Sequence, residues 1–115
     1  MPRPVRSSSS TFGRRLRSLR EQAGLSQEKL GVAIGLDEGP ATVRIGRYEN
    51  GIHEPSSAVV ELLARALGVL PPYFSCEDDD LAEVIRGWSQ LTEAERHRAR
   101  KIVKRAVNRR EKADK

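Results

Sequence analysis

The hydrophobic residues of the first 75 positions recur every three or four residues, in short runs separated by glycine and proline. This spacing predicts helices with one apolar face. The first helix is expected from about Phe12 to Ala23, with Thr11 as its N-cap and Gly24 as its stop, because hydroxyl side chains favour helix starts and glycine favours helix ends. Its apolar face contains Phe12, Leu16, Leu19 and Ala23.

Serine and proline mark the starts of the next two helices. Ser26 is expected to cap a helix over about 27–34. Leu36 to Gly39 predict a turn. Pro40 fits the first position of a third helix, running to about Asn50, because a proline lacks the N–H that would be unpaired there.

Two more helices complete this part of the chain. A fourth is expected to open at Pro55 and Ser56 and to end at Gly68, and Pro71 and Pro72 start a short fifth one. Five short helices joined by tight turns within residues 12–75 predict a compact all-α bundle.

Two further amphipathic helices are expected after an acidic segment. The apolar stripe of the first, which we expect to cover the core of the bundle, consists of Leu81, Val84, Ile85 and Trp88. Thr92 and Glu95 have the spacing of a capping box and open the second helix, which is expected to fray beyond Val107. On one side of this last helix lie Ala99, Ile102, Val103 and Ala106, with no further element left to bury them.

The length and composition fit one small helical domain with tails. The chain has 115 residues, of which 37% are hydrophobic and 32% charged, and this length excludes a two-domain enzyme. No apolar run is long enough to cross a bilayer, and the first residues lack the apolar segment of a signal peptide. We divide the chain into a disordered basic arm (1–10), a bundle (11–75), a helical extension (76–107) and a disordered basic tail (108–115).

The net charge of +5 is segregated along the chain. Residues 76–83 hold five acidic and no basic side chains, whereas residues 84–115 hold eleven basic and four acidic ones. Six arginines also lie between Arg3 and Arg20. Such basic blocks favour a polyanionic partner, although a solvated tail has the same composition. A transit peptide is a further alternative for the start of the chain, but its second half continues into a packed-helix pattern.

The sequence lacks the side-chain combinations of a catalytic or metal site. His53 and His97 have no nucleophile or ligand cluster beside them, and Cys76 is the single cysteine. The acidic run Asp78–Asp80 could suggest a metal site, but carboxylates before a helix are stabilised by its dipole. We therefore expect no catalytic residue, no metal and no cofactor.

One combination of motifs between residues 12 and 75 points to a family. It consists of Ala23-Gly24-Leu25-Ser26-Gln27, Arg47-Tyr48-Glu49-Asn50-Gly51 and Pro55, together with Leu19-Arg20, Leu30, Gly35 and Ile45. This combination resembles the Cro and phage-repressor type of helix-turn-helix, the XRE family. The resemblance implies a five-helix lambda-repressor-like domain that binds double-stranded DNA, with its third helix, the expected recognition helix, in the major groove.

The resemblance also implies roles for individual residues. Base readout falls on Thr42, Val43 and Arg47, and Arg47 is the best candidate because a guanidinium bonds bidentately to guanine. Phosphate contacts are expected from Ser26, Gln27, Arg44, Asn50, Arg14 and Arg15. Arg20 and Glu49 are expected to form an ion pair that orients the third helix. The alternatives are helix capping for Gln27, a solvated helix face for Arg47, and ordinary capping or packing for Thr42 and Val43.

Two features depart from the family pattern. The span from Gly35 to Ile45 is longer than in compact members, which predicts an enlarged turn at Asp37–Pro40. Gly46 stands inside the third helix where a serine is common, and a helical glycine costs about 0.5 to 1 kcal/mol relative to alanine.

These observations predict a cytoplasmic, bacterial or phage-encoded transcription regulator, a repressor that binds an inverted repeat as a homodimer and has no membrane partner. The dimer would form through the apolar side of the last helix. In a competing hypothesis this helix folds back on its own protomer and adds phosphate contacts. A further alternative is an antitoxin-like autoregulator whose C-terminal part binds a protein partner.

Overall fold

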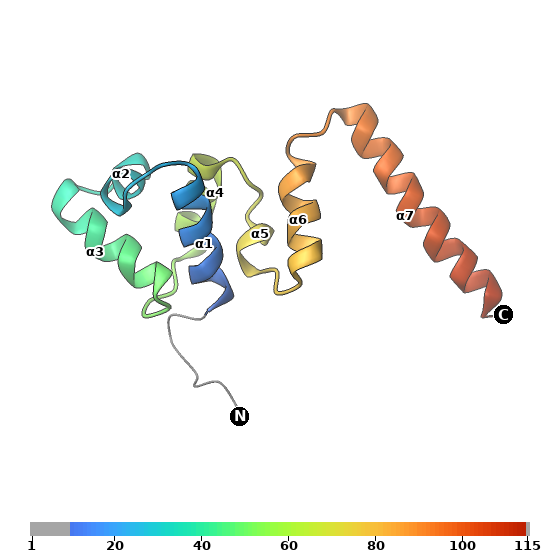
Figure 1. Ribbon diagram of the computed structural model, residues 1–115, viewed down its shortest axis with the longest axis horizontal. Helices are drawn as coiled ribbons and strands as arrows, with labels where there is room; N and C mark the ends of the chain where they lie inside the picture. Colours follow the sequence, from blue (N-terminus) through green and yellow to red (C-terminus); the bar gives the residue numbers. More distant parts are fainter. Residues whose placement is uncertain (1–9, 115) are drawn as a thin grey trace, which may run out of the picture.

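The structure is a computed structural model that describes residues 10–114, and the described residues form seven helices and no strand (Figure 1). They are α1 (Thr11–Gln22), α2 (Gln27–Ala33), α3 (Glu38–Glu49), α4 (Ser57–Leu67), α5 (Pro72–Ser75), α6 (Asp79–Trp88) and α7 (Glu93–Ala113). The predicted all-α fold class is confirmed. The predicted disordered arm lies outside the described residues, apart from Ser10.

Helices α1 to α5 enclose one core, and we call this part the α1–α5 bundle. Its largest fully buried side chains come one from each helix: Leu16, Leu30, Ile45, Leu63 and Phe74. Burying a side chain of this size stabilises a fold by about 1.5 to 3 kcal/mol. All five helices are therefore needed to complete the core that positions α3.

Helices α2 and α3 approach each other most closely where two small residues meet. A Cβ atom built on Gly31 would lie 2.5 Å from the Cβ of Ala41, and both residues are buried. Glycine at this position lets the two helix backbones come close, since any larger side chain would overlap Ala41. This contact fixes the turn between the two helices.

The structure corrects two predicted helix starts. The N-cap of α1 is Ser10, whose Oγ accepts from the Gly13 N–H at 3.0 Å, and Thr11 is the first helical residue. Helix α3 begins at Glu38, not at Pro40, with Asp37 as its N-cap. Helix α3 therefore starts two residues earlier than predicted, about half a turn, and Glu38 to Pro40 belong to the helix and not to an enlarged turn before it. Pro40 is tolerated because the first turn of a helix needs no N–H donor.

The side of α6 that packs against the bundle differs from the predicted one. Ala82 is buried and Ile85 half-buried, whereas Leu81 and Val84 are exposed to 51% and 60%. The predicted stripe is thus only partly used for the core, and its remaining apolar surface faces away from the bundle.

Helix α7 is longer than predicted and projects from the rest of the molecule (Figure 1). It keeps its helical conformation to Ala113, so the tail expected to be disordered from residue 108 is helical over most of its length. The predicted capping box of Thr92 and Glu95 is present, and its hydrogen bonds lower the pKa of Glu95. No residue of α7 is buried. Among the described helices, none has both the length and the apolar character needed to cross a membrane.

Candidate nucleic-acid interface

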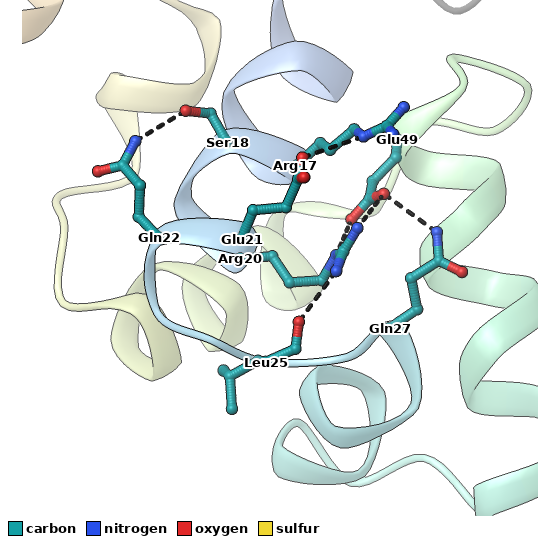
Figure 2. A network of polar contacts seen from close by, with 8 residues as sticks. All are labelled: Arg17, Ser18, Arg20, Glu21, Gln22, Leu25, Gln27 and Glu49. Atoms are coloured by element: carbon teal, nitrogen blue, oxygen red, sulfur yellow. Dashed lines mark hydrogen bonds and ion pairs between the residues drawn. The ribbon is translucent and has the colours of Figure 1, made fainter.

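The predicted ion pair between Arg20 and Glu49 joins α1 to the last residue of α3 (Figure 2). The Arg20 guanidinium donates to both Glu49 carboxylate oxygens, at 3.1 Å for Nη2 to Oε1, and to the Leu25 carbonyl at 2.9 Å. The two side chains are only 12% and 2% exposed. The hydrogen bond that Arg20 donates to Glu49 raises the pKa of Arg20, so the guanidinium stays charged. Because both partners are enclosed, the pair fixes the direction of the recognition helix.

Gln27 extends this network to the start of α2. Its Nε2 donates to Glu49 Oε1 at 3.1 Å (Figure 2). A Cβ built on Gly46 would lie 3.6 Å from the same nitrogen. The amide therefore lies against the recognition helix at its glycine. Only one of its two N–H groups is used here, and the phosphate contact expected of Gln27 stays a prediction. The sequence suggested a phosphate contact or helix capping for Gln27 and gave no sign of its contact with Glu49, 22 positions away.

The outer face of α3 carries all of the side chains that the family resemblance assigned to base readout. Ala41, Ile45, Tyr48 and Glu49 are the buried residues of α3. On the exposed surface of the same helix lie Thr42, Val43, Arg44 and Arg47. Val43 is 52% exposed. The alternative in which Val43 belongs to the core is thereby excluded within this chain.

The loop after α3 returns to this face and adds two residues that the sequence did not indicate. One depression is lined by Pro40, Val43, Arg44, Arg47, Tyr48, His53 and Glu54. The chain reverses at Gly51, which has φ of 71°, and the N–H groups of Ile52 and His53 donate to the Arg47 carbonyl at 2.9 and 3.3 Å. These bonds place His53 and Glu54 beside the recognition helix. A glycine directly after a predicted helix was the available signal.

Besides Arg44, three more of the residues predicted to contact phosphate are in positions that a ligand can reach. Ser26, Asn50 and Arg14 are exposed, and Ser26 also caps α2 through the hydrogen bond from Lys29 N–H to its Oγ at 3.0 Å. They lie directly before α2, directly after α3 and on α1, respectively.

Arg15 does not fit the phosphate contact predicted for it, because it is only 8% exposed. Its guanidinium donates to the Cys76 carbonyl at 2.9 and 2.6 Å and to Asp79 at 2.9 Å, and it lies over the Tyr73 ring. Arg15 therefore holds α1 against the junction of α5 and α6. The sequence could not show this role because these partners lie about sixty positions away along the chain.

The four residues predicted to form a dimer interface remain accessible on α7. Ala99 is half-buried, Ala106 is exposed, and Ile102 and Val103 are 68% and 63% exposed. Ala99 and Val103 also line an open apolar groove of about 520 Å³ between α6 and α7. Arg96 of α7 contacts the end of α6, because its guanidinium donates to the Trp88 carbonyl at 3.0 Å and lies over the Trp88 ring.

No group of three or more histidine, cysteine, aspartate or glutamate side chains within residues 10–114 is arranged to hold a metal ion. Asp78 instead caps α6, accepting from the Leu81 N–H at 3.0 Å. Asp78 therefore acts as a helix cap, which is the role that a carboxylate before a helix is expected to have.

Comparisons with known proteins agree with this geometry. The helix-turn-helix domain family matches residues 11–72, which is more than half of the chain. Among solved structures, the crystal structure of the transcriptional regulator BswR is similar, with 36% sequence identity, a TM-score of 0.76, and coverage of 81% of this chain and 92% of that one. A search of curated proteins gave no match. Because 81% of the chain exceeds the family match, the similarity to BswR includes part of the region after α5. The chain belongs to the helix-turn-helix domain family.

Proposed function

We propose that this protein is a sequence-specific DNA-binding transcription regulator of the Cro and phage-repressor type, which represses transcription from an inverted-repeat operator. The observation that carries the proposal is the division of α3 into two faces. One face is locked by the Arg20–Glu49–Gln27 network, and the other presents Val43 and Arg47 to solvent. The similarity to a transcriptional regulator at 36% identity supports the same function.

In the proposed complex α3 enters the major groove. Arg47 donates to guanine O6 and N7, while Thr42 and Val43 contact thymine methyl groups. Phosphate contacts come from the half-buried Gln27 and from four exposed residues, namely Ser26, Arg44, Asn50 and Arg14. Base contacts determine which DNA sequence is preferred, whereas phosphate contacts raise the affinity for every sequence alike.

Selection of bound sites from a random DNA pool tests this assignment. The wild-type protein is expected to select one motif with two-fold symmetry. Arg47→Ala should relax the base preference at one position of each half-site, since a bidentate arginine contact is worth about 1 to 3 kcal/mol of discrimination. Arg44→Ala is the matched control on the same helix, and it should weaken binding without changing the motif. An Arg47→Ala motif identical to the wild-type one would refute the readout role.

The proposed homodimer forms through the apolar side of α7. Ile102 and Val103 are exposed within one chain, and burying them against a second copy removes apolar surface from water. Two-fold pairing would place two recognition helices about one DNA turn, roughly 34 Å, apart.

Sedimentation of the full chain tests the dimer. Ile102→Asp should convert a dimer into a folded monomer, because a charge in an apolar interface is left unpaired. Ile52→Asp is the matched control, since Ile52 is also exposed, at 58%, but lies in the loop after α3. A wild-type protein that is monomeric at micromolar concentration with and without DNA would overturn the dimer. It would leave the groove between α6 and α7 to the antitoxin-like alternative, in which a different protein binds there.

A further inference from the structure

The positive charge of this protein is concentrated in α7. Residues 96–112 contain nine arginine and lysine side chains and one glutamate, a net charge of +8. The rest of the chain contains twelve basic and fifteen acidic side chains, a net charge of −3. The predicted DNA-binding half is thus not the main source of the basic character of the protein.

Four of these basic residues form one stripe along α7, which we call the basic stripe: Arg98, Lys101, Arg105 and Lys112. At about 100° per residue they fall within a sector of roughly 60°, and at about 1.5 Å per residue the stripe is roughly 21 Å long. All four are exposed, and none of them forms a salt bridge with another described residue. The one salt bridge of α7 joins Arg100 to Glu93 at 3.6 Å.

The basic stripe and the apolar side of α7 point in different directions. On the same helical projection the centre of the stripe lies about 120° from the centre of the side that carries Ala99, Ile102, Val103 and Ala106. Pairing of the apolar sides in a dimer would therefore leave the basic stripe accessible.

The basic stripe also lies far from the recognition helix. Figure 1 shows α3 and α7 at opposite ends of the molecule, which extends over 59 Å along its longest axis. Ile45 and Tyr48 face the core, so the exposed face of α3 points outward from the bundle. A duplex bound to α3 therefore sits at the end of the molecule opposite to the basic stripe of the same chain (Figure 1).

We propose that the basic stripe of α7 is a second nucleic-acid site, which binds the phosphate backbone of a segment other than the one held by α3. This proposal rests on the proposed function for the first segment. Regularly spaced guanidinium and ammonium groups release counterions from a duplex whatever its sequence. Along the duplex axis each strand has one phosphate per about 3.4 Å, so the stripe, roughly 21 Å long, spans about six base-pair steps. Such a protein holds its operator and a second DNA segment together.

An anionic membrane is the competing partner for a basic helix. Helices that lie in a membrane interface carry large apolar or aromatic residues on the side opposite to the charges. The apolar side of α7 carries alanine, isoleucine and valine, and α7 contains no aromatic residue. Its composition therefore favours a partner that is bound through charge alone.

Binding of the full-length protein to a random-sequence duplex at several salt concentrations tests the site. Combined substitution of Arg98, Lys101 and Arg105 by glutamine should reduce the slope of log affinity against log salt by about 2 to 3, at about 0.9 per lost phosphate contact. The matched control replaces Arg17, Arg65 and Arg86 by glutamine, which removes the same charge from α1, α4 and α6. Equal slopes for the two triple variants would overturn the proposal, because net charge alone would then explain the binding.

A capture experiment tests whether two segments are held at once. Wild-type protein on an immobilised inverted-repeat site, selected from the random pool, should retain a labelled random duplex. The α7 triple variant should stay on the site but release the labelled duplex. Failure of the wild type to retain it, or binding of the wild type to phosphatidylserine vesicles in place of the duplex, would overturn the proposal. A random pool that yields no motif while the slope still depends on α7 would instead overturn the proposed function and leave this site in place.

Discussion

The α1–α5 bundle and helix α7 are both made of amphipathic helix, but their stability has different sources. Each helix of the bundle places at least one large side chain in a common core, whereas α7 buries no residue at all. The bundle is held by contacts between distant parts of the chain. Helix α7 is held by its own capping box and by Arg96 at its base.

The same sequence pattern therefore has two different roles in this protein. The apolar stripe of a short helix such as α2, with seven residues, packs against other helices of the chain, because such a helix is unstable alone. A 21-residue helix can persist without tertiary contacts and leave both its apolar side and its basic stripe to other molecules. The following changes test that comparison, from the largest expected effect to the smallest.

Glu49→Ala should have the largest effect, because it leaves the enclosed Arg20 guanidinium without its carboxylate. We expect a loss of about 3 kcal/mol in the free energy of unfolding, measured by urea denaturation. Glu21→Ala is the matched control. It removes the exposed Arg17–Glu21 pair on the same helix α1 and should cost about 0.5 kcal/mol or less. Equal losses in the two variants would show that the enclosed pair contributes no more than a surface pair.

Gly31→Ala should disturb the contact between α2 and α3, since the new Cβ would lie 2.5 Å from that of Ala41. Overpacking of this kind costs about 1 to 3 kcal/mol. In Gly39→Ala, on the first turn of α3, no heavy atom lies within 4 Å of the new Cβ, so no loss is expected. A Gly31→Ala protein as stable as wild type would mean that the helices separate without cost.

Arg15→Ala should detach α6 from the bundle more than Asp79→Ala does. The arginine is buried and bonds both the Cys76 carbonyl and Asp79, so its loss should cost about 2 kcal/mol. The Asp79 side chain is 78% exposed, and its loss should cost about 1 kcal/mol or less. Amide exchange of α6 is the measurement. Faster exchange of α6 in Asp79→Ala than in Arg15→Ala would contradict the dominant role of the carbonyl contact.

Gly46→Ala should stabilise the bundle by about 0.5 to 1 kcal/mol, because alanine is the better helix former. The new Cβ would make ordinary contact with the Gln27 amide at 3.6 Å, so no clash offsets the gain. The thermal midpoint should rise accordingly. A fall would show that the amide needs the space above the glycine to keep its bond to Glu49.

The smallest effect concerns the first turn of α7 at acid pH. Hydrogen bonds from Thr92 lower the pKa of Glu95 in the folded helix. The stability that the ionised Glu95 adds is therefore present above its unfolded pKa of about 4.3 and is lost as pH falls through its folded pKa. The amide signal of Thr92 should report this loss. Glu95→Gln, which keeps the acceptor oxygen, should remove the pH dependence, and Glu93→Gln should leave it unchanged.

The sequence by itself determined the helices, the family and the side of α3 that faces solvent. These features rest on local information: residue spacing, caps such as Ser26, glycine stops such as Gly68, and a motif whose members lie in one segment of the chain. The Arg20–Glu49 pair was also predictable, because the motif itself contains both residues.

Only the tertiary structure decided which arginines and which apolar stripes make contacts within the folded chain. Arg14 and Arg15 are neighbours with the same chemistry, yet one is exposed and the other bonds Cys76 and Asp79. The stripe on α6 was predicted to cover the core, but the bundle contacts Ala82 and leaves Val84 exposed. The physical reason is that periodicity shows which residues share a face of a helix. It does not show what that face meets, because this depends on partners distant in sequence.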